Sequence, residues 1–158
     1  MSEPVFAVVG HPNKGKSCIV ATLAQDDSVH IAPEPGTTSK CRRYPAVVDG
    51  QTLYTLVDTP GFQRARGALA WMKERETSAA KRGEVVRQFL EAYRGGEAFP
   101  DECELLWPIM AGAGILYVVD GSRPYGEEYE AEMKILRWTG RPSMALINPI
   151  ADERHVEE

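Results

Sequence analysis

The chain has 158 residues, of which 43% are hydrophobic and 26% charged, the composition of an ordinary globular domain with one core. No apolar run approaches the roughly 20 residues that a membrane-spanning helix needs. The net charge of -5 gives no electrostatic basis for general binding to nucleic acid or acidic lipid. Three cysteines without metal-site spacing, and an N-terminus without a secretory signal, predict a cytoplasmic protein with free thiols.

The first predicted element is a strand over residues 5–9, whose continuous apolar run rich in β-branched residues is typical of a buried parallel strand. It ends at Gly10. A helix is predicted from Lys16, where apolar residues recur at helical spacing. Residues 28–42 contain prolines and a glycine without a clear period, and they predict a mobile loop.

A β-hairpin is predicted next, in RYPAVVDGQTLYTLVD, because Asp49 and Gly50 separate two β-prone runs. The two strands should be antiparallel. Three charged helical segments follow, at about residues 68–81, 84–93 and 101–110.

Two further buried strands are predicted over residues 114–121 and 143–148, with an amphipathic helix between them over 127–138. The alternation of strands and helices predicts a doubly wound α/β fold. Its sheet should be mostly parallel, with one antiparallel strand from the hairpin.

The stretch GHPNKGKS carries the first chemical motif. Gly10, Gly15, Lys16 and Ser17 fit the phosphate-binding pattern G-x-x-x-x-G-K-[ST], between a predicted strand and a predicted helix. Such a loop surrounds phosphate oxygens with backbone N–H groups, while the lysine reaches the β and γ phosphates and the serine hydroxyl faces Mg²⁺. The alternative is a glycine-rich turn with an exposed lysine, which the strand and helix context disfavours.

The second motif is LVDTPGF, residues 56–62, at the end of a predicted strand. Asp58 could hold Mg²⁺ directly or through water, and the backbone N–H of Gly61 could sense a γ-phosphate. A D-x-x-G turn alone is a weak signal. It becomes specific because it follows a phosphate-binding loop with a hairpin between them.

With GHPNKGKS, PGTT and DTPG in this order, the chain resembles the translation-factor class of P-loop GTPases, in particular the Era-like and tRNA-modification GTPase branch. The resemblance implies the three-layer α/β sandwich of P-loop NTPases, GTP and GDP as ligands, and a hydrolase that uses Mg²⁺ and water. It implies catalytic roles for Lys16, Thr38 and Gly61, and Mg²⁺ ligation by Ser17, Thr38 and Asp58. The implied nucleotide contacts are Gly10, Asn13, Lys14, Gly15, Lys16, Ser17, Cys18, Asp58, Gly61 and Asn148.

Two residues refine the implied mechanism. Phe62 stands where many small GTPases carry a glutamine that orients the attacking water, so slow intrinsic hydrolysis is expected. Asn13 matches the asparagine that helps to bind K⁺ in potassium-stimulated relatives, where the cation offsets developing charge. The alternative for Asn13 is a cap of the loop.

The base-reading motif departs from the family pattern. Where relatives have N-K-x-D, this chain has Asn148-Pro149-Ile150-Ala151, with Asp152 one residue late. Guanine specificity therefore depends on the resemblance of the first three motifs, and Asn148 is equally well explained as a turn residue before proline. An ATP-preferring P-loop NTPase remains an alternative.

The length after Asp58 also departs from a minimal GTPase, because ninety residues separate Asp58 from Asn148. The surplus forms a helical insertion at about residues 63–112. Only ten residues follow Asn148. We therefore expect residues 1–158 to be a GTPase domain lacking its last strand and helix, similar to the N-terminal domain of longer bacterial proteins that carry a C-terminal domain of unknown function.

A second hypothesis is a nucleotide-gated docking module with little or no hydrolysis, in which the insertion binds a protein effector that the sequence does not name. An unpaired apolar sheet edge at the last strand would also favour a homodimer.

Overall fold

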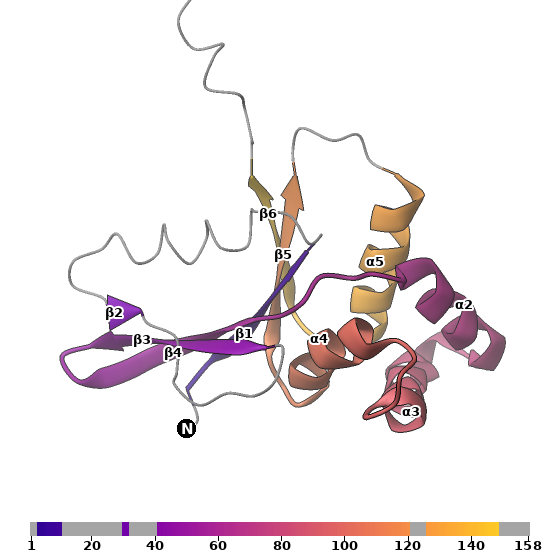
Figure 1. Ribbon diagram of the computed structural model, residues 1–158, viewed down its shortest axis with the longest axis horizontal. Coiled ribbons are helices and arrows are strands. Elements are labelled where there is room, and N and C mark those ends of the chain that lie inside the picture. The colour runs from indigo at the N-terminus through magenta and orange to yellow at the C-terminus, as the bar shows by residue number, and fades with distance from the viewer. Residues whose placement is uncertain (1–2, 11–29, 32–40, 121–125, 149–158) are drawn as a thin grey trace, which may run out of the picture.

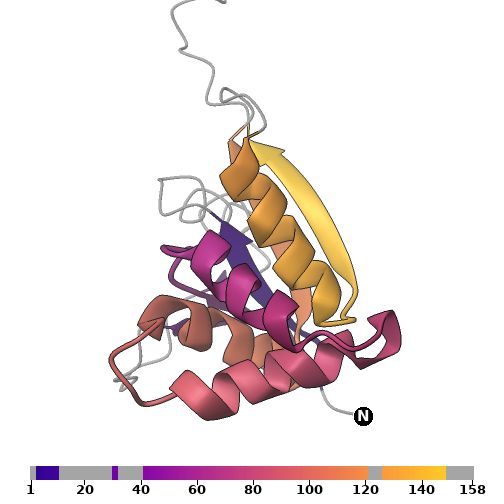
Figure 2. The ribbon, with the colours of Figure 1, turned by 90° about the vertical axis from the view of Figure 1, so that its right-hand side faces the viewer.

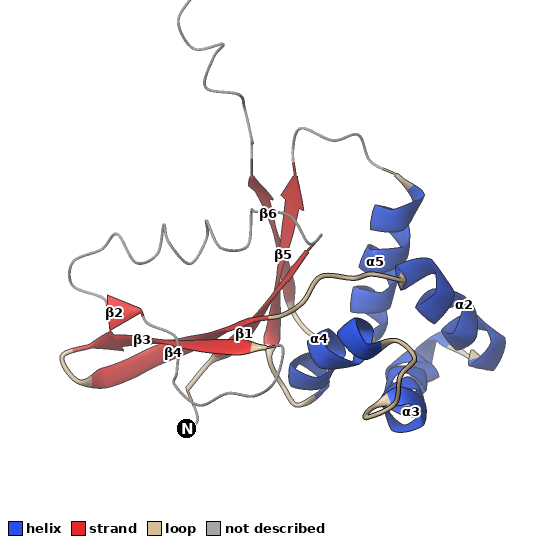
Figure 3. Cartoon of the chain, in the orientation of Figure 1, coloured by secondary structure: helices blue, strands red, loops and turns tan. Residues whose placement is uncertain are grey.

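A computed structural model gives the structure of the protein and describes residues 3–10, 30–31, 41–120 and 126–148 (Figure 1). They form a sheet and a layer of helices (Figure 3). The strands are β1 (Val5–Gly10), β2 (His30–Ile31), β3 (Arg42–Val48), β4 (Gln51–Asp58), β5 (Gly114–Asp120) and β6 (Ser143–Asn148). The helices are α2 (Ala65–Arg75), the 3-10 turn η1 (Ala79–Lys81), α3 (Arg82–Tyr93), α4 (Pro100–Met110) and α5 (Glu127–Trp138).

The six described strands form one sheet in the order β2-β3-β4-β1-β5-β6. The pairs β4-β1, β1-β5 and β5-β6 are parallel, whereas β3 is antiparallel to both β2 and β4. Within the described sheet, β3 alone runs against the other strands. The predicted mostly parallel α/β sheet with one antiparallel strand is therefore confirmed.

The β3-β4 hairpin turns at Asp49 and Gly50, as predicted. Their φ angles of 50° and 76° are both positive, as a two-residue turn of type I′ requires. Asp49 adopts such angles more readily than most residues, and Gly50 does so without steric cost. The residue types at these two positions therefore explain where the hairpin turns.

The predicted loop over residues 28–42 is wrong at its two ends. His30 and Ile31 form the short strand β2, which pairs with Val47 and Ala46, and Arg42 already belongs to β3. A strand of two residues has no period that a sequence pattern could reveal, and its formation depends on the neighbouring strand. Residues 32–40 lie outside the described part of the chain.

Of the three helices predicted between β4 and β5, the first has both of its boundaries wrong. The first was expected over 68–81, but α2 begins at Ala65 and ends at Arg75, because Glu76 is extended with φ -67° and ψ 122°. The separate turn η1 then leads into α3. The other two helices, and α5 at 127–138, lie where they were expected. The predicted helix from Lys16 lies outside the described residues.

Helices α2, α3, α4 and α5 cover one face of the sheet (Figures 1 and 2). Strand β1 is buried on both sides, because Ala7 and Val9 join the core under the helices while Val8 packs with Leu56 and Val118 on the opposite face. A central strand whose residues alternate between two apolar environments explains why residues 5–9 read as one continuous apolar run.

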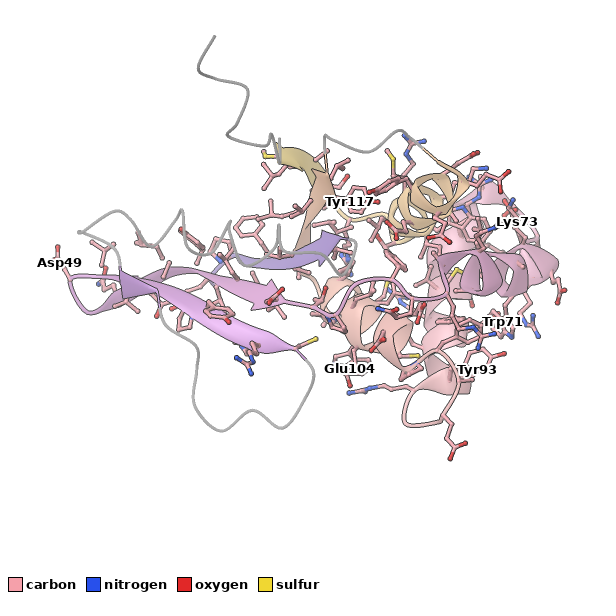
Figure 4. All side chains as sticks on the ribbon, turned by 45° about the horizontal axis from the view of Figure 1, so that its top comes forward. Asp49, Trp71, Lys73, Tyr93, Glu104 and Tyr117 are labelled. Carbon is pink, nitrogen blue, oxygen red and sulfur yellow. The ribbon has the colours of Figure 1, made fainter. Side chains whose placement is uncertain are left out.

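Aromatic rings fill the outer part of the helical layer. Trp71 of α2, Phe89 and Tyr93 of α3, and Phe99 before α4 contact each other with ring centroids 5.0 to 5.6 Å apart. Trp71 and Tyr93 lie side by side at the surface of this cluster (Figure 4). Helices α2, α3 and α4 therefore share one packed interior.

Candidate functional site

The carboxyl ends of four parallel strands lie at one edge of the sheet, in the order β4, β1, β5, β6. Three predicted site residues end such strands: Asp58 ends β4, Gly10 ends β1 and Asn148 ends β6. Asp58 and Gly10 lie on adjacent strands, since β4 pairs with β1, whereas β5 separates Gly10 from Asn148. In open α/β sheets, ligands bind outside this edge.

Gly10 occupies a position where no side chain fits. A Cβ atom built on its backbone would lie 2.7 Å from the carbonyl oxygen of Val118 on β5 and 3.3 Å from the Val118 Cβ. Only glycine allows β1 and β5 to approach this closely at the point where the chain leaves the sheet. Close packing against β5 therefore explains why the first residue of the phosphate-binding pattern is glycine.

The chain after Asp58 is held against β1. The hydroxyl of Thr59 donates a hydrogen bond of 2.8 Å to the Val8 carbonyl oxygen, and the Thr59 N–H approaches the same oxygen at 3.3 Å. Thr59 is buried, while Asp58 is half-buried. The bond keeps the end of β4, and with it the Asp58 carboxylate, beside the end of β1.

Gly61 and Phe62 turn the chain from the sheet toward α2. Both are buried, and the Phe62 side chain packs in the core under the helices, with 3% of its surface exposed. A side chain held in this core does not reach solvent at the strand ends, and an apolar ring has no group to orient water. At the position that carries glutamine in many small GTPases, this chain therefore has a core residue that holds the segment before α2 against the helices.

Sequence reasoning missed Glu102, a fully buried residue of α4. Its Oε1 accepts hydrogen bonds from the backbone N–H groups of Gln63, at 3.1 Å, and Arg64. The sequence showed only an acidic residue in the first turn of a helix, which is a common pattern. Nothing in that pattern identifies backbone partners 38 and 39 residues away.

Helix α4 also contacts the chain just before β3. The Cys41 thiol donates to the main-chain carbonyl of Glu104, with an Sγ–O distance of 3.2 Å. Glu104 lies on the part of α4 that faces β3 (Figure 4). Cys41 follows the PGTT motif by three residues. Helix α4 thus touches chain segments that adjoin two of the predicted motifs.

A surface hollow of about 450 Å³ lies away from the strand ends, between α3 and α4. The Arg94 guanidinium lies over the ring of Trp107, 3.1 Å from its centroid, and 46% of the Trp107 surface is exposed. The hollow is lined by Arg87, Leu90, Glu91, Arg94, Trp107, Met110 and Ala111.

The remaining predicted site residues, Asn13, Lys14, Gly15, Lys16, Ser17, Cys18 and Thr38, lie outside the described residues. In the described ranges, no group of three or more His, Cys, Asp or Glu residues gathers as a metal cage. A single carboxylate at the end of β4 fits Mg²⁺, which proteins bind through one or two carboxylates together with substrate phosphates. No described helix is both long and apolar enough to cross a membrane.

Comparison with known proteins decides the family. The sequence profile of the family described as "50S ribosome-binding GTPase" matches residues 5–149. The chain belongs to this GTPase family. The match includes all of the predicted site residues and the helices between β4 and β5.

Curated relatives agree with this membership. The chain is 37% identical over 120 residues to GTPase Der of Lactobacillus helveticus, a match that covers 73% of this chain and 27% of the relative. It is 29% identical over 146 residues to GTPase Der of Mycoplasma pneumoniae, covering 92% of this chain and 27% of that protein. The chain thus spans about a quarter of the length of these relatives.

Era shares the fold. The structure of a single-residue variant of Aquifex aeolicus Era bound to GDP.AlF4- matches 96% of this chain and 42% of the Era chain, with a TM-score of 0.53 and 20% identity. A second Era structure, in complex with MgGDPNP and nucleotides 1506-1542 of 16S ribosomal RNA, has the same TM-score, covering 97% of this chain and 42% of that chain at 20% identity. The expected Era-like P-loop GTPase fold is confirmed.

Proposed function

We propose that the chain binds GTP with Mg²⁺ at the carboxyl edge of its sheet, hydrolyses it slowly to GDP and phosphate, and acts as a nucleotide switch. The observation that carries this proposal is the junction of β1 and β4, where an obligatory glycine and a carboxylate end neighbouring strands. Family membership over residues 5–149 supports the same function.

The proposed roles follow the motif positions. Backbone N–H groups of the loop after Gly10 surround the phosphates, and Lys16 balances the charge of the β and γ phosphates. The N–H of Gly61 binds the γ-phosphate. Water is the nucleophile, and the residues contribute by positioning and electrostatics. Asn13, Lys14, Gly15, Ser17, Cys18 and Asn148 complete the proposed contacts to the nucleotide.

The proposed metal site consists of Ser17, Thr38 and Asp58, with the nucleotide phosphates as further ligands. When bound there, Mg²⁺ neutralises phosphate charge and orients the β and γ phosphates. Asn13 is the proposed ligand of a K⁺ ion beside the phosphates. Slow hydrolysis follows from the buried Phe62 ring, which leaves the attacking water without a side-chain amide at that position.

Calorimetry with GTP, GDP and ATP tests nucleotide binding, and the release of phosphate in a single turnover tests hydrolysis. GTP should bind and ATP should compete weakly, while Lys16→Ala should abolish binding and Asp58→Asn should weaken the dependence on Mg²⁺. Faster release in potassium than in sodium would support the role of Asn13. Equal displacement of a fluorescent analogue by GTP and ATP would defeat the guanine assignment.

The second candidate function is a docking module that is gated by nucleotide and hydrolyses it little. The exposed Trp107, stacked by Arg94 beside a hollow, favours the inserted helices as the surface for a protein effector. Absence of phosphate release in either cation, together with intact GTP binding, would favour this candidate. A homodimer through the exposed β6, where Met144 is 60% exposed, is the other proposed assembly, and light scattering tests it.

A further inference from the structure

The N-terminus of α2 lacks a cap from its own sequence. Its N-cap residue is Arg64, whose side chain makes no capping hydrogen bond, and the first turn contains no acidic residue. Helix N-termini have unpaired N–H groups and a positive dipole end, so a negative partner stabilises them. The chain directly before α2 is Gly61-Phe62-Gln63-Arg64, the continuation of the DTPG motif.

Glu102 supplies this missing negative partner from another helix. Its Oε1 accepts the N–H groups of both Gln63 and Arg64, and its side chain is completely buried. A carboxylate in the interior makes strong hydrogen bonds to N–H groups. Its second oxygen, Oε2, is also buried and has no hydrogen-bond partner in the described part of the chain. A buried carboxylate oxygen without a hydrogen-bond partner costs free energy, so the surrounding structure must hold the Glu102 side chain in place.

The start of α4 is shaped to bring Glu102 to this place. Phe99 precedes the helix with φ 51° and ψ 46°, a left-handed conformation that is unusual for an aromatic residue. Pro100 then begins the helix, which places Glu102 in its first turn. The Arg64 guanidinium also lies over the Phe99 ring, 5.0 Å from the centroid. Backbone hydrogen bonds to Glu102 and a cation–π contact with Phe99 therefore join this segment to the start of α4.

We propose that Glu102 is a positioning residue of the switch: its buried carboxylate fixes the segment that follows Gly61, so that α4 of the insertion senses whether a γ-phosphate is bound. This inference rests on the proposed role of the Gly61 N–H. Glu102 acts through the backbone of Gln63 and Arg64 and does not touch the nucleotide. The Cys41–Glu104 hydrogen bond attaches the chain after the PGTT motif to the same helix.

The test compares binding of a non-hydrolysable GTP analogue with binding of GDP, because only the first carries the γ-phosphate. Glu102→Ala removes the acceptor, and Glu102→Asp keeps the charge but shortens the reach by one methylene. Glu102→Gln keeps an acceptor oxygen. The matched control is Glu132→Gln on α5, since Glu132 is equally buried but accepts a hydrogen bond from Tyr117 of β5.

We expect Glu102→Ala and Glu102→Asp to weaken binding of the GTP analogue about tenfold, the scale of typical coupling between sites, while GDP affinity changes less than about twofold. In Glu102→Gln, the ratio of the affinities for the GTP analogue and for GDP should be close to that of the unmodified protein. In Glu132→Gln this ratio should not change.

Two results would overturn the inference: equal loss of both affinities in the Glu102 variants, or an unchanged ratio in folded Glu102→Asp. If Glu102→Ala does not fold, the Asp and Gln variants decide. Failure of the proposed function is distinguishable, because the unmodified protein would then bind neither nucleotide.

Discussion

The hydroxyl of Thr59 and the carbonyl oxygen of Val8, 2.8 Å apart, join the carboxyl ends of β4 and β1 inside the protein. Thr59→Val keeps the shape of the side chain but removes the donor. The free energy of unfolding should fall by about 1–2 kcal/mol, as expected for a buried hydrogen bond whose acceptor loses a partner. Urea denaturation measures the change. Thr59→Ser should retain most of the stability, and equal stability of all three proteins would contradict the prediction.

Gly10→Ala should destabilise the protein and impair nucleotide binding together. The new Cβ would meet the Val118 carbonyl oxygen at 2.7 Å, so β1 or β5 must shift, at a cost of about 1–3 kcal/mol. Denaturant unfolding gives the stability, and titration with GTP gives the affinity. If Gly10→Ala had the stability and the GTP affinity of the unmodified protein, the close approach of β1 and β5 would not be required for either property.

Gly67→Ala is the contrasting substitution. Gly67 is the third residue of α2, where an added Cβ would meet only the Phe99 ring at 3.4 Å, an ordinary contact distance. Alanine is a better helix former than glycine and loses less backbone entropy on folding, so the melting temperature should rise, with about 0.5 kcal/mol of added stability. Destabilisation by this change would mean that the Phe99 ring has no freedom to adjust.

Phe89→Ala should be the most destabilising single change in the aromatic cluster. The Phe89 side chain is fully buried and contacts the rings of Trp71, Tyr93 and Phe99. Its removal should cost about 3–5 kcal/mol through lost burial and a cavity. Trp107→Ala is the control, since its half-exposed ring should cost only about 1 kcal/mol, mainly the contact with Arg94. Thermal unfolding, monitored by circular dichroism, measures the loss of stability in each variant.

Stability should decline at alkaline pH through Cys103. Burial, supported by the charges of Glu102 and Glu104, raises the pKa of this thiol from 9.0 to about 11. Below pH 9.0 the thiol is protonated in both states, and between pH 9.0 and about 11 the unfolded chain alone loses the proton. The free energy of unfolding should therefore fall over this interval.

Because other groups also titrate at alkaline pH, the informative quantity is the difference between the unmodified protein and Cys103→Ala at each pH. That difference should shrink as the pH rises above 9.0. A difference that is constant with pH would show that the thiol ionises equally in both states. In the native state the same thiol should also react slowly with thiol reagents, because the thiolate is the reactive form.

Local chemistry explains which parts of the fold could be predicted. The Asp49-Gly50 turn and the boundaries of α5 and β6 follow from nearby residues, and all three were predicted correctly. The early start of α2 at Ala65 and the strand β2 depend on partners distant in the sequence, Glu102 for the first and β3 for the second. Neither partner could be read from the local pattern.

In the candidate site, too, some features follow from local sequence and others depend on distant packing. Parallel topology places Gly10, Asp58 and Asn148 at one edge, so their motifs were enough to predict strand-end positions. The burial of Phe62 and the reach of Glu102 depend on how α4 packs against the chain before α2. A sequence shows that a helix is present, but not which backbone amides its side chains will meet.

The helices between β4 and β5 come from one unbroken stretch, yet Ala7 and Val9 of β1 and Ile115 of β5 are buried in the core beneath them. Excising the stretch would expose apolar sheet surface to water, at roughly 25 cal/mol for each Å² uncovered. A chimera that exchanged these helices for a shorter connection would therefore have to replace sheet residues as well. Natural variation in this connection should be accompanied by compensating changes on the covered faces of β1 and β5.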